Sequence, residues 1–271
     1  MGDVILFACG GAARHILSST RESPGVPVVF LDSHSGSSIP MADAEIGAHM
    51  DQYDAYTLAY DNREEICASM RGMRVVIAFA VLGGGSGTGM LPVVARCAHE
   101  EGCAVVTVAG LPMQFESERR RTATQALPEI LEASDRMIIM DIETINRLFP
   151  DIKAHHVMNR IASSITFSAR SMASLMEGPF FSTFTQRIYT VAYTTDISPS
   201  SAEGRAVEAS MFPVDPSYGK SVVMVSSGFG TAQIESIFST VVSMTGIIPD
   251  IVKREDGDDT KVLTFLPVHG F

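Results

Sequence analysis

Short apolar runs alternate with segments of helical periodicity through the first half of the chain. The apolar runs have the length of buried strands, and they cover residues 3–8, 26–31, 74–82, 104–109 and 136–140. The segments between them place apolar residues at helical spacing, and they cover residues 12–19, 61–70, 91–101 and 117–133. Strands that alternate with helices favour a parallel sheet covered on both faces. This half therefore predicts a Rossmann-like α/β domain.

The pattern changes after residue 151. Residues 152–176 contain no proline or glycine, and Val157, Ile161 and Ile165 mark one apolar face, which predicts a long helix. Beyond it we expect strands and helices in mixed order, at residues 187–194, 202–209, 221–225 and 234–244, and then a hairpin formed by residues 247–254 and 261–268. The predicted organisation is an α/β domain over residues 1–151, a central connecting helix over 152–177 and a smaller mixed α/β C-terminal domain over 178–271.

A glycine-rich segment, GGGSGTG at residues 83–89, directly follows the apolar run at 74–82. Glycines let the backbone approach a ligand closely, and free N–H groups at the start of a helix bind anions. The carboxyl end of a parallel strand is also where such sheets bind ligands. We therefore predict that the domain over residues 1–151 binds the phosphates of a nucleotide through Gly83, Gly84, Gly85, Ser86, Gly87, Thr88 and Gly89.

Two common classes of nucleotide site fit this sequence poorly. The P-loop pattern requires a lysine after the glycines, and no lysine lies near residues 83–89. A dinucleotide site has some support, because Gly10 and Gly11 follow the first strand and Asp32 lies 21 residues after Gly11. The pattern G-x-G-x-x-G is absent there, however. A dinucleotide-dependent enzyme is therefore the weakest of the alternatives that we retain.

Composition narrows the range of partners. The formal net charge is −11, which disfavours a broad nucleic-acid-binding surface. No apolar run reaches the roughly 18 residues of a membrane-spanning helix, and the N-terminus lacks the basic start of a secretory signal. We expect a cytoplasmic protein without direct membrane insertion.

The four cysteines have no metal-ligand spacing and are expected to be reduced core residues.

The segment at residues 83–89 resembles the tubulin/FtsZ signature GGGTGTG, with Ser86 in place of a threonine. The similarity continues through Pro92-Val93-Val94-Ala95 and through residues 112–121, which look like the PFxFEGxxR segment of FtsZ. Residues 204–209 resemble a helix of the second FtsZ domain, so the resemblance spans nearly the whole chain. It implies binding of GTP or GDP, with Mg²⁺ held by the phosphates.

The resemblance also implies roles for single residues. Gly10 and Gly11 would form a first glycine loop, Gly47 and Ala48 would belong to a loop that senses the γ-phosphate, Glu116 would contact the ribose, and Arg120 would contact the phosphates. The family selects guanine through two asparagines. Here the first region reads Asp141-Ile142-Glu143, and the second position is Ser163, with Asn159 one turn earlier as a substitute.

The main departure from the family concerns hydrolysis. FtsZ hydrolyses GTP between stacked subunits, where an acidic loop of one subunit polarises water at the nucleotide of the next. The equivalent stretch here, residues 179–187 (PFFSTFTQR), contains no carboxylate. Without an acid to orient water, we expect little or no GTPase activity from this chain alone, and we assign no catalytic residue.

The sequence thus predicts a divergent FtsZ-like protein of the cytoskeletal, cell-division type. It would bind guanine nucleotide and form filaments by assembling head to tail, with itself or with another FtsZ-family protein. The alternative is a scaffold or regulator that keeps the fold but acts without nucleotide.

Overall fold

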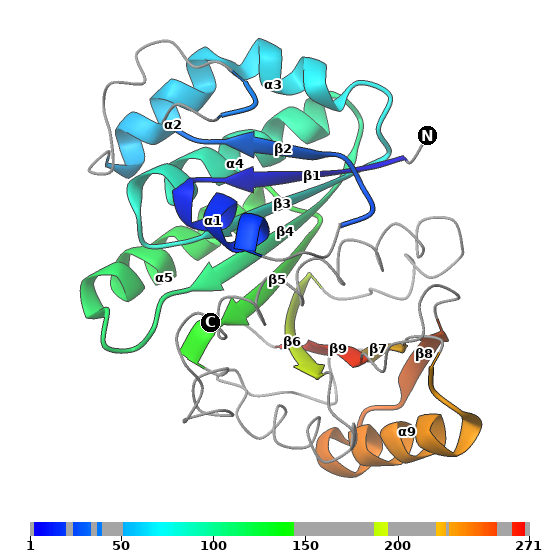
Figure 1. Cartoon of the computed structure of the whole chain (residues 1–271). Helices are drawn as coiled ribbons and strands as arrows, with labels where there is room; N and C mark the ends of the chain where they lie inside the picture. Colours follow the sequence, from blue (N-terminus) through cyan, green and yellow to red (C-terminus); the bar gives the residue numbers. More distant parts are fainter. Residues whose placement is uncertain are drawn as a thin grey trace.

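A computed structural model describes residues 3–19, 24–33, 37–39, 51–143, 187–194, 221–225, 228–253 and 262–268 of the chain. Figure 1 shows one long twisted sheet with helices packed on its two faces. Within the described residues, no helix combines the length and the hydrophobicity needed to cross a membrane.

The first part of the chain forms alternating strands and helices. In order, they are β1 (Val4–Cys9), α1 (Gly11–Ser19), β2 (Val28–Leu31), α2 (Gln52–Asp61), α3 (Arg63–Met70), β3 (Val75–Val81), α4 (Gly85–Glu100), β4 (Ala104–Leu111), α5 (Ser117–Glu132) and β5 (Arg136–Asp141). The five strands pair in parallel in the order β2-β1-β3-β4-β5. This arrangement confirms the predicted α/β fold class.

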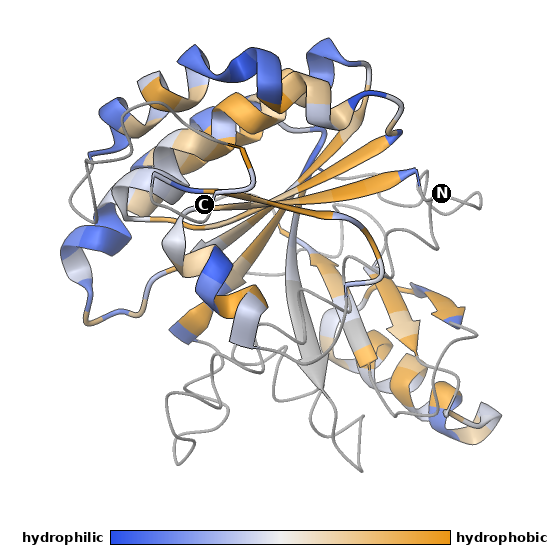
Figure 2. Ribbon diagram, turned by 45° about the horizontal axis from the view of Figure 1, so that its top comes forward, coloured by the Kyte–Doolittle hydropathy of each residue, from blue (hydrophilic) through white to orange (hydrophobic). Residues whose placement is uncertain are grey.

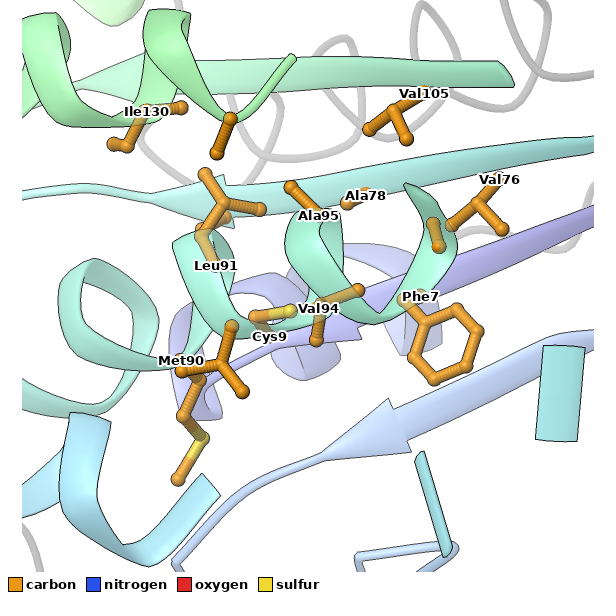
Figure 3. Close-up of a cluster of buried hydrophobic side chains, with 14 of the residues drawn as sticks. Phe7, Cys9, Val76, Ala78, Met90, Leu91, Val94, Ala95, Val105 and Ile130 are labelled. Carbon is orange, nitrogen blue, oxygen red and sulfur yellow. The ribbon is translucent and has the colours of Figure 1, made fainter. Parts of the chain in front are cut away.

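β1 and β3 are buried along their whole length, as expected for strands of a sheet that is covered on both faces. Along β1, Ile5, Phe7 and Cys9 enter one buried cluster, and Val4 and Leu6 enter another on the opposite face. Figure 3 shows Phe7 and Cys9 in the cluster beneath α4, and Figure 2 shows hydrophobic residues concentrated along the strands. Each methylene buried in this way contributes about 0.8 kcal/mol to stability.

The second part of the chain continues the same sheet. Its elements are β6 (Ile188–Thr194), β7 (Ser221–Val225), α9 (Thr231–Thr245), β8 (Pro249–Lys253) and β9 (Val262–Pro267). β6 pairs with β5 in parallel, and the order then runs β6-β9-β7-β8, which gives nine strands. Arg187, just before β6, donates hydrogen bonds to the carbonyls of Leu131 and Ser134. The two parts are therefore joined by backbone pairing and by side-chain contacts.

The hairpin predicted over residues 247–254 and 261–268 is wrong. β8 and β9 both exist, but β7 lies between them, pairing with β8 in parallel and with β9 antiparallel. All five residues of β7 are buried. The helix α9 connects β7 to β8 as a crossover, the connection that parallel neighbours require.

The prediction of a single helix over residues 61–70 was also incomplete. Two helices, α2 and α3, meet at Asn62, whose side-chain amide donates to the Leu58 carbonyl at 2.7 Å. Asp51 caps α2 by accepting hydrogen bonds from the N–H groups of Tyr53 and Asp54. The aromatic residues Tyr53 and Tyr60 are 74% and 48% exposed. An apolar face was therefore hard to recognise in this segment.

The helices predicted over residues 152–177 and 202–209 lie outside the described residues. The predicted domain limits therefore stay predictions.

Candidate functional site

Two glycine segments meet at the carboxyl ends of β1 and β3. Gly10 follows β1 with φ of +85°, a conformation that favours glycine, and its N–H donates to the Leu31 carbonyl at 2.7 Å. A Cβ atom on Gly10 would lie only 2.7 Å from the backbone nitrogen of Gly87. The first glycine loop and the glycine-rich segment therefore form a single site.

Most of the glycine-rich segment is helical. α4 begins at Gly85, with Gly84 as its N-cap, whereas the sequence had predicted a loop up to residue 89 and a helix from residue 91. Gly83, at φ of +85°, makes the turn from β3 into the helix. The free N–H groups of the first helical turn thus lie within the segment that was predicted to bind phosphate.

A cavity of about 260 Å³ lies where the two segments meet. Six of the predicted residues line it, namely Gly10, Gly11, Gly84, Gly85, Ser86 and Gly87. Residues that the sequence analysis had not assigned to phosphate contacts also line it, and they are Cys9, Ala12, Arg14, Asp32, Val81 and Arg119. The helix N–H groups, the Ser86 hydroxyl and the two arginines suit an anion such as phosphate, whereas the Asp32 carboxylate opposes one.

The three positions of the segment that do not line this cavity, Gly83, Thr88 and Gly89, contact protein. Thr88 is 3% exposed, and its hydroxyl accepts a hydrogen bond from the Gly83 N–H at 2.9 Å. Gly89 packs against α2, where a Cβ atom would lie 2.1 Å from the Gln52 carbonyl oxygen. Both residues border a second cavity, of about 330 Å³, among α2, α4 and α5. In this structure they fix the position of α4.

β2 supplies polar groups to the same cavity. The Asp32 side chain is 4% exposed, and its Oδ1 atom accepts a hydrogen bond from the Ser33 N–H at 2.9 Å. The hydroxyls of Ser33 and Ser86 lie 3.1 Å apart, which joins the end of β2 to the start of α4. The sequence did single out Asp32, because it follows a strand about twenty residues after the first glycines.

The two residues predicted from the PFxFEGxxR resemblance lie at the start of α5. Arg120 is directed to Asp141 at the end of β5, with its two terminal nitrogens 3.1 and 3.0 Å from the two carboxylate oxygens. It also donates to the Pro112 carbonyl. Glu116 forms an ion pair with Arg119 at 2.5 Å and accepts from the Met113 N–H at 3.2 Å. Arg119, and not Arg120, borders the cavity.

Four predicted site residues lie outside the described residues: Gly47, Ala48, Asn159 and Ser163. Residues 179–186, most of the stretch that replaces the acidic loop, lie outside them as well. Their predicted roles in sensing the γ-phosphate, selecting the base and limiting hydrolysis stay predictions.

The four cysteines are free and buried, as the sequence analysis expected. Burial raises the pKa of the Cys9 and Cys97 thiols far above the ordinary value, so both stay protonated at neutral pH. Within the part of the chain that the structure describes, no group of three or more histidine, cysteine or acidic side chains is arranged to hold a metal ion.

Comparison with known proteins agrees with this geometry. Residues 32–150 match a family model described as the Tubulin/FtsZ family, GTPase domain. Cell division protein FtsZ of Haloferax mediterranei is 39% identical over 152 residues, which are 51% of this chain and 40% of that protein. Cell division protein FtsZ 2 of Methanocaldococcus jannaschii is 36% identical over 165 residues, 55% of this chain and 43% of that protein. The matched segment spans less than half the length of these curated relatives.

Solved structures share the fold over almost the whole chain. An FtsZ dimer from M. jannaschii superposes with a TM-score of 0.76 at 17% identity and covers 98% of this chain and 88% of that one. CetZ2 from Haloferax volcanii, solved as a GTPγS-bound protofilament, gives a TM-score of 0.73 at 15% identity, with 97% and 92% covered. The family match over residues 32–150, the moderate sequence identity and the shared fold together support a member of the tubulin/FtsZ superfamily.

Proposed function

We propose that this chain is an FtsZ-like cytoskeletal protein that binds a guanine nucleotide and assembles head to tail. The observation that carries the proposal is the cavity at the N-terminus of α4, where Gly10 of the first glycine loop packs against Gly87 of α4. The match of residues 32–150 to the Tubulin/FtsZ family, GTPase domain, supports guanine as the base. The structural likeness to an FtsZ dimer and to a CetZ2 protofilament supports assembly.

The phosphates would be held chiefly by the protein backbone. The first turn of α4 offers N–H groups without carbonyl partners, and the helix dipole places about half a positive charge at this end. At Gly84, a Cβ atom would meet only the Arg119 Nη2 atom, at 3.8 Å. The absence of a side chain therefore leaves room for a ligand at this position.

Hydrolysis by the chain alone would be weak. Residues 179–187 supply no carboxylate to orient water at a neighbouring subunit's nucleotide. In mixed filaments this chain would then slow the GTP turnover of a conventional FtsZ. If its addition leaves both the GTPase rate and the filament length of such an FtsZ unchanged, co-assembly with that protein is excluded.

Nucleotide binding is tested by calorimetry with GTP, GDP, ATP and NAD, together with chromatography of any nucleotide released on denaturation. We expect GTP and GDP to bind, and Gly84→Val to abolish binding while the protein stays folded. The backbone of Gly84 is extended, with φ of −103° and ψ of 171°, so valine is compatible with it.

Gly230 provides a matched control for Gly84. It is also an N-cap glycine with an extended backbone, at φ of −79° and ψ of 164°, and its Cβ atom would also meet a side-chain atom at 3.8 Å. Gly230→Val should therefore bind guanine nucleotide like the unmodified protein. Equal loss of binding in both variants would show that the cavity has no special role.

The nucleotide-independent scaffold remains the second candidate, and one observation favours it. Arg120 is engaged with Asp141 and Glu116 with Arg119, so both residues that the resemblance assigns to the nucleotide are already paired within the protein. A purified protein that binds none of the four nucleotides would favour this second function over the first.

A further inference from the structure

Two arginines from separate elements border the cavity, and neither was assigned a ligand by the sequence. Arg14 lies on α1 one turn after Gly10, where its N–H donates to the Gly10 carbonyl at 3.1 Å. Arg119 lies in the first turn of α5. A guanidinium group donates two parallel hydrogen bonds to a phosphate, and such charge-assisted bonds are stronger than those from a neutral N–H.

Arg119 is fixed against the glycine-rich segment. A Cβ atom on Gly83 would lie 2.2 Å from the Arg119 carbonyl oxygen, so the start of α5 packs directly on that glycine. The Arg119 Nη2 atom lies 3.8 Å from the Cβ position of Gly84, the N-cap of α4. Its Nη1 atom bonds to Glu116 Oε1 at 2.5 Å, which holds the guanidinium at the rim of the cavity.

The neighbouring Arg120 is in a different environment. Its side chain is 12% exposed and that of Asp141 is 3% exposed, with both terminal nitrogens bonded to the carboxylate. Contact between Arg120 and a ligand would remove the ion-pair partner of the buried Asp141 carboxylate and leave it the hydrogen bond from the Glu143 N–H at 3.1 Å. Removing one member of a buried ion pair is strongly unfavourable. Arg119, in contrast, is 46% exposed and its partner Glu116 is 26% exposed, so water can solvate Glu116 when Arg119 moves to an anion.

We propose that Arg119 and Arg14 are the phosphate-binding side chains of this cavity, and that they make it selective for the polyphosphate group of a nucleotide over a monophosphate. The inference rests on the proposed nucleotide-binding function and deepens it. Two guanidinium groups from different helices reach more phosphate oxygens in a diphosphate or triphosphate than in a monophosphate. The affinity should therefore increase with the number of phosphates in the ligand.

The test measures dissociation constants for GTP, GDP, GMP and inorganic pyrophosphate with the full chain and with Arg119→Gln and Arg14→Gln. Loss of a charge-assisted hydrogen bond weakens affinity by about 10- to 100-fold. We expect each variant to lose about this much affinity for GTP and pyrophosphate and much less for GMP. Arg119→Lys should recover part of the GTP affinity, because it restores charge but not the paired donors.

Arg121→Gln is the matched control. Arg121 is on the same helix and pairs with Glu118 three residues earlier at 2.7 Å, as Arg119 pairs with Glu116, but its side chain is 65% exposed and it does not border the cavity. Its GTP affinity should stay within about twofold of the unmodified value, since surface pairs contribute little. Circular dichroism confirms that each variant is folded.

The possible outcomes separate the two proposals. In the first outcome the unmodified chain binds GTP, and the variants Arg119→Gln and Arg14→Gln bind GTP as tightly as Arg121→Gln does. The two-arginine proposal is then overturned while the nucleotide-binding function stands. If the chain binds pyrophosphate in an Arg119-dependent way but no guanine nucleotide, the arginine assignment stands and the proposed function fails. If it binds neither, both are overturned.

Discussion

In the glycine-rich segment and at the start of α5, neighbouring residues have different surroundings. We call residues that line the cavity at the start of α4 the cavity side, and residues that contact other protein atoms the packing side. On the cavity side are Gly84, Ser86 and Arg119, which line the space at the start of α4. On the packing side are Thr88, Gly89 and Arg120, which bond to or pack against protein atoms. The glycine-rich segment and the start of α5 therefore each combine residues that leave room for a ligand with residues that hold the helices in place. Substitutions on the two sides should therefore have different consequences.

The largest expected effect is on the packing side, at the Arg120–Asp141 pair. Arg120→Met keeps the apolar stem of the side chain but leaves a carboxylate that is 3% exposed without its partner. Removing one member of a buried ion pair costs about 3–5 kcal/mol. Urea unfolding should show this loss, and the double variant Arg120→Met/Asp141→Leu should recover part of it. A loss under about 1 kcal/mol in the single variant would contradict the buried pair.

The next largest loss of stability is expected for Gly89→Ala. The added Cβ atom would lie 2.1 Å from the Gln52 carbonyl oxygen and 2.8 Å from the Tyr56 backbone nitrogen, so α2 must move away from α4. Overpacking of this kind costs about 1–3 kcal/mol. The thermal midpoint should fall, whereas nucleotide affinity measured well below that midpoint should change little. A stable variant that has lost nucleotide binding would place Gly89 on the cavity side instead.

Thr88→Val tests a single hydrogen bond on the packing side. Valine has nearly the same shape as threonine, but it cannot accept the bond from the Gly83 N–H, now 2.9 Å long. Leaving that donor without a partner should cost about 1–3 kcal/mol in the free energy of unfolding. If the threonine hydroxyl instead serves mainly to donate to phosphate, the variant should keep its stability and lose GTP affinity.

The smallest effect on stability belongs to the cavity side. Gly84→Ala places a Cβ atom 3.8 Å from the nearest side-chain atom, in ordinary contact, and should cost about 1 kcal/mol or less, because alanine is a poorer N-cap than glycine. Calorimetry should nevertheless show weaker GTP binding. Equal losses of stability in Gly84→Ala and Gly89→Ala would remove the distinction between the two sides.

The sequence predicted well the strands that are built around a continuous apolar run. β1, β3, β4 and β5 are buried on both faces, so a continuous apolar run was enough to identify them. α2 was missed because Tyr53 and Tyr60 are exposed whereas Tyr56 packs against the core, so its aromatic residues do not mark one buried face. The positions of β8 and β9 were misjudged because the local pattern of a strand does not specify its neighbour. Both strands pair with β7, a different segment of the chain, and not with each other.

The candidate site shows the same limit at the level of single residues. Residues 83–89 and the loop at Gly10 were predictable, because glycine at these positions has a direct physical reason. The different environments of Arg119 and Arg120 were not predictable from the sequence. Adjacent helical residues point about 100° apart, and which of them faces the cavity depends on where β5 places Asp141. That position is a property of the assembled sheet.

The place of β9 in the sheet also orders events during protein synthesis. Strands β1 to β5 all precede residue 142, so they can pair while the ribosome is still making the rest of the chain. β6 and β7 pair with β9 and not with each other, so neither gains that neighbour until residues 262–267 have been made. During that interval β6 presents an unpaired edge, to which the strands of another nascent chain could add.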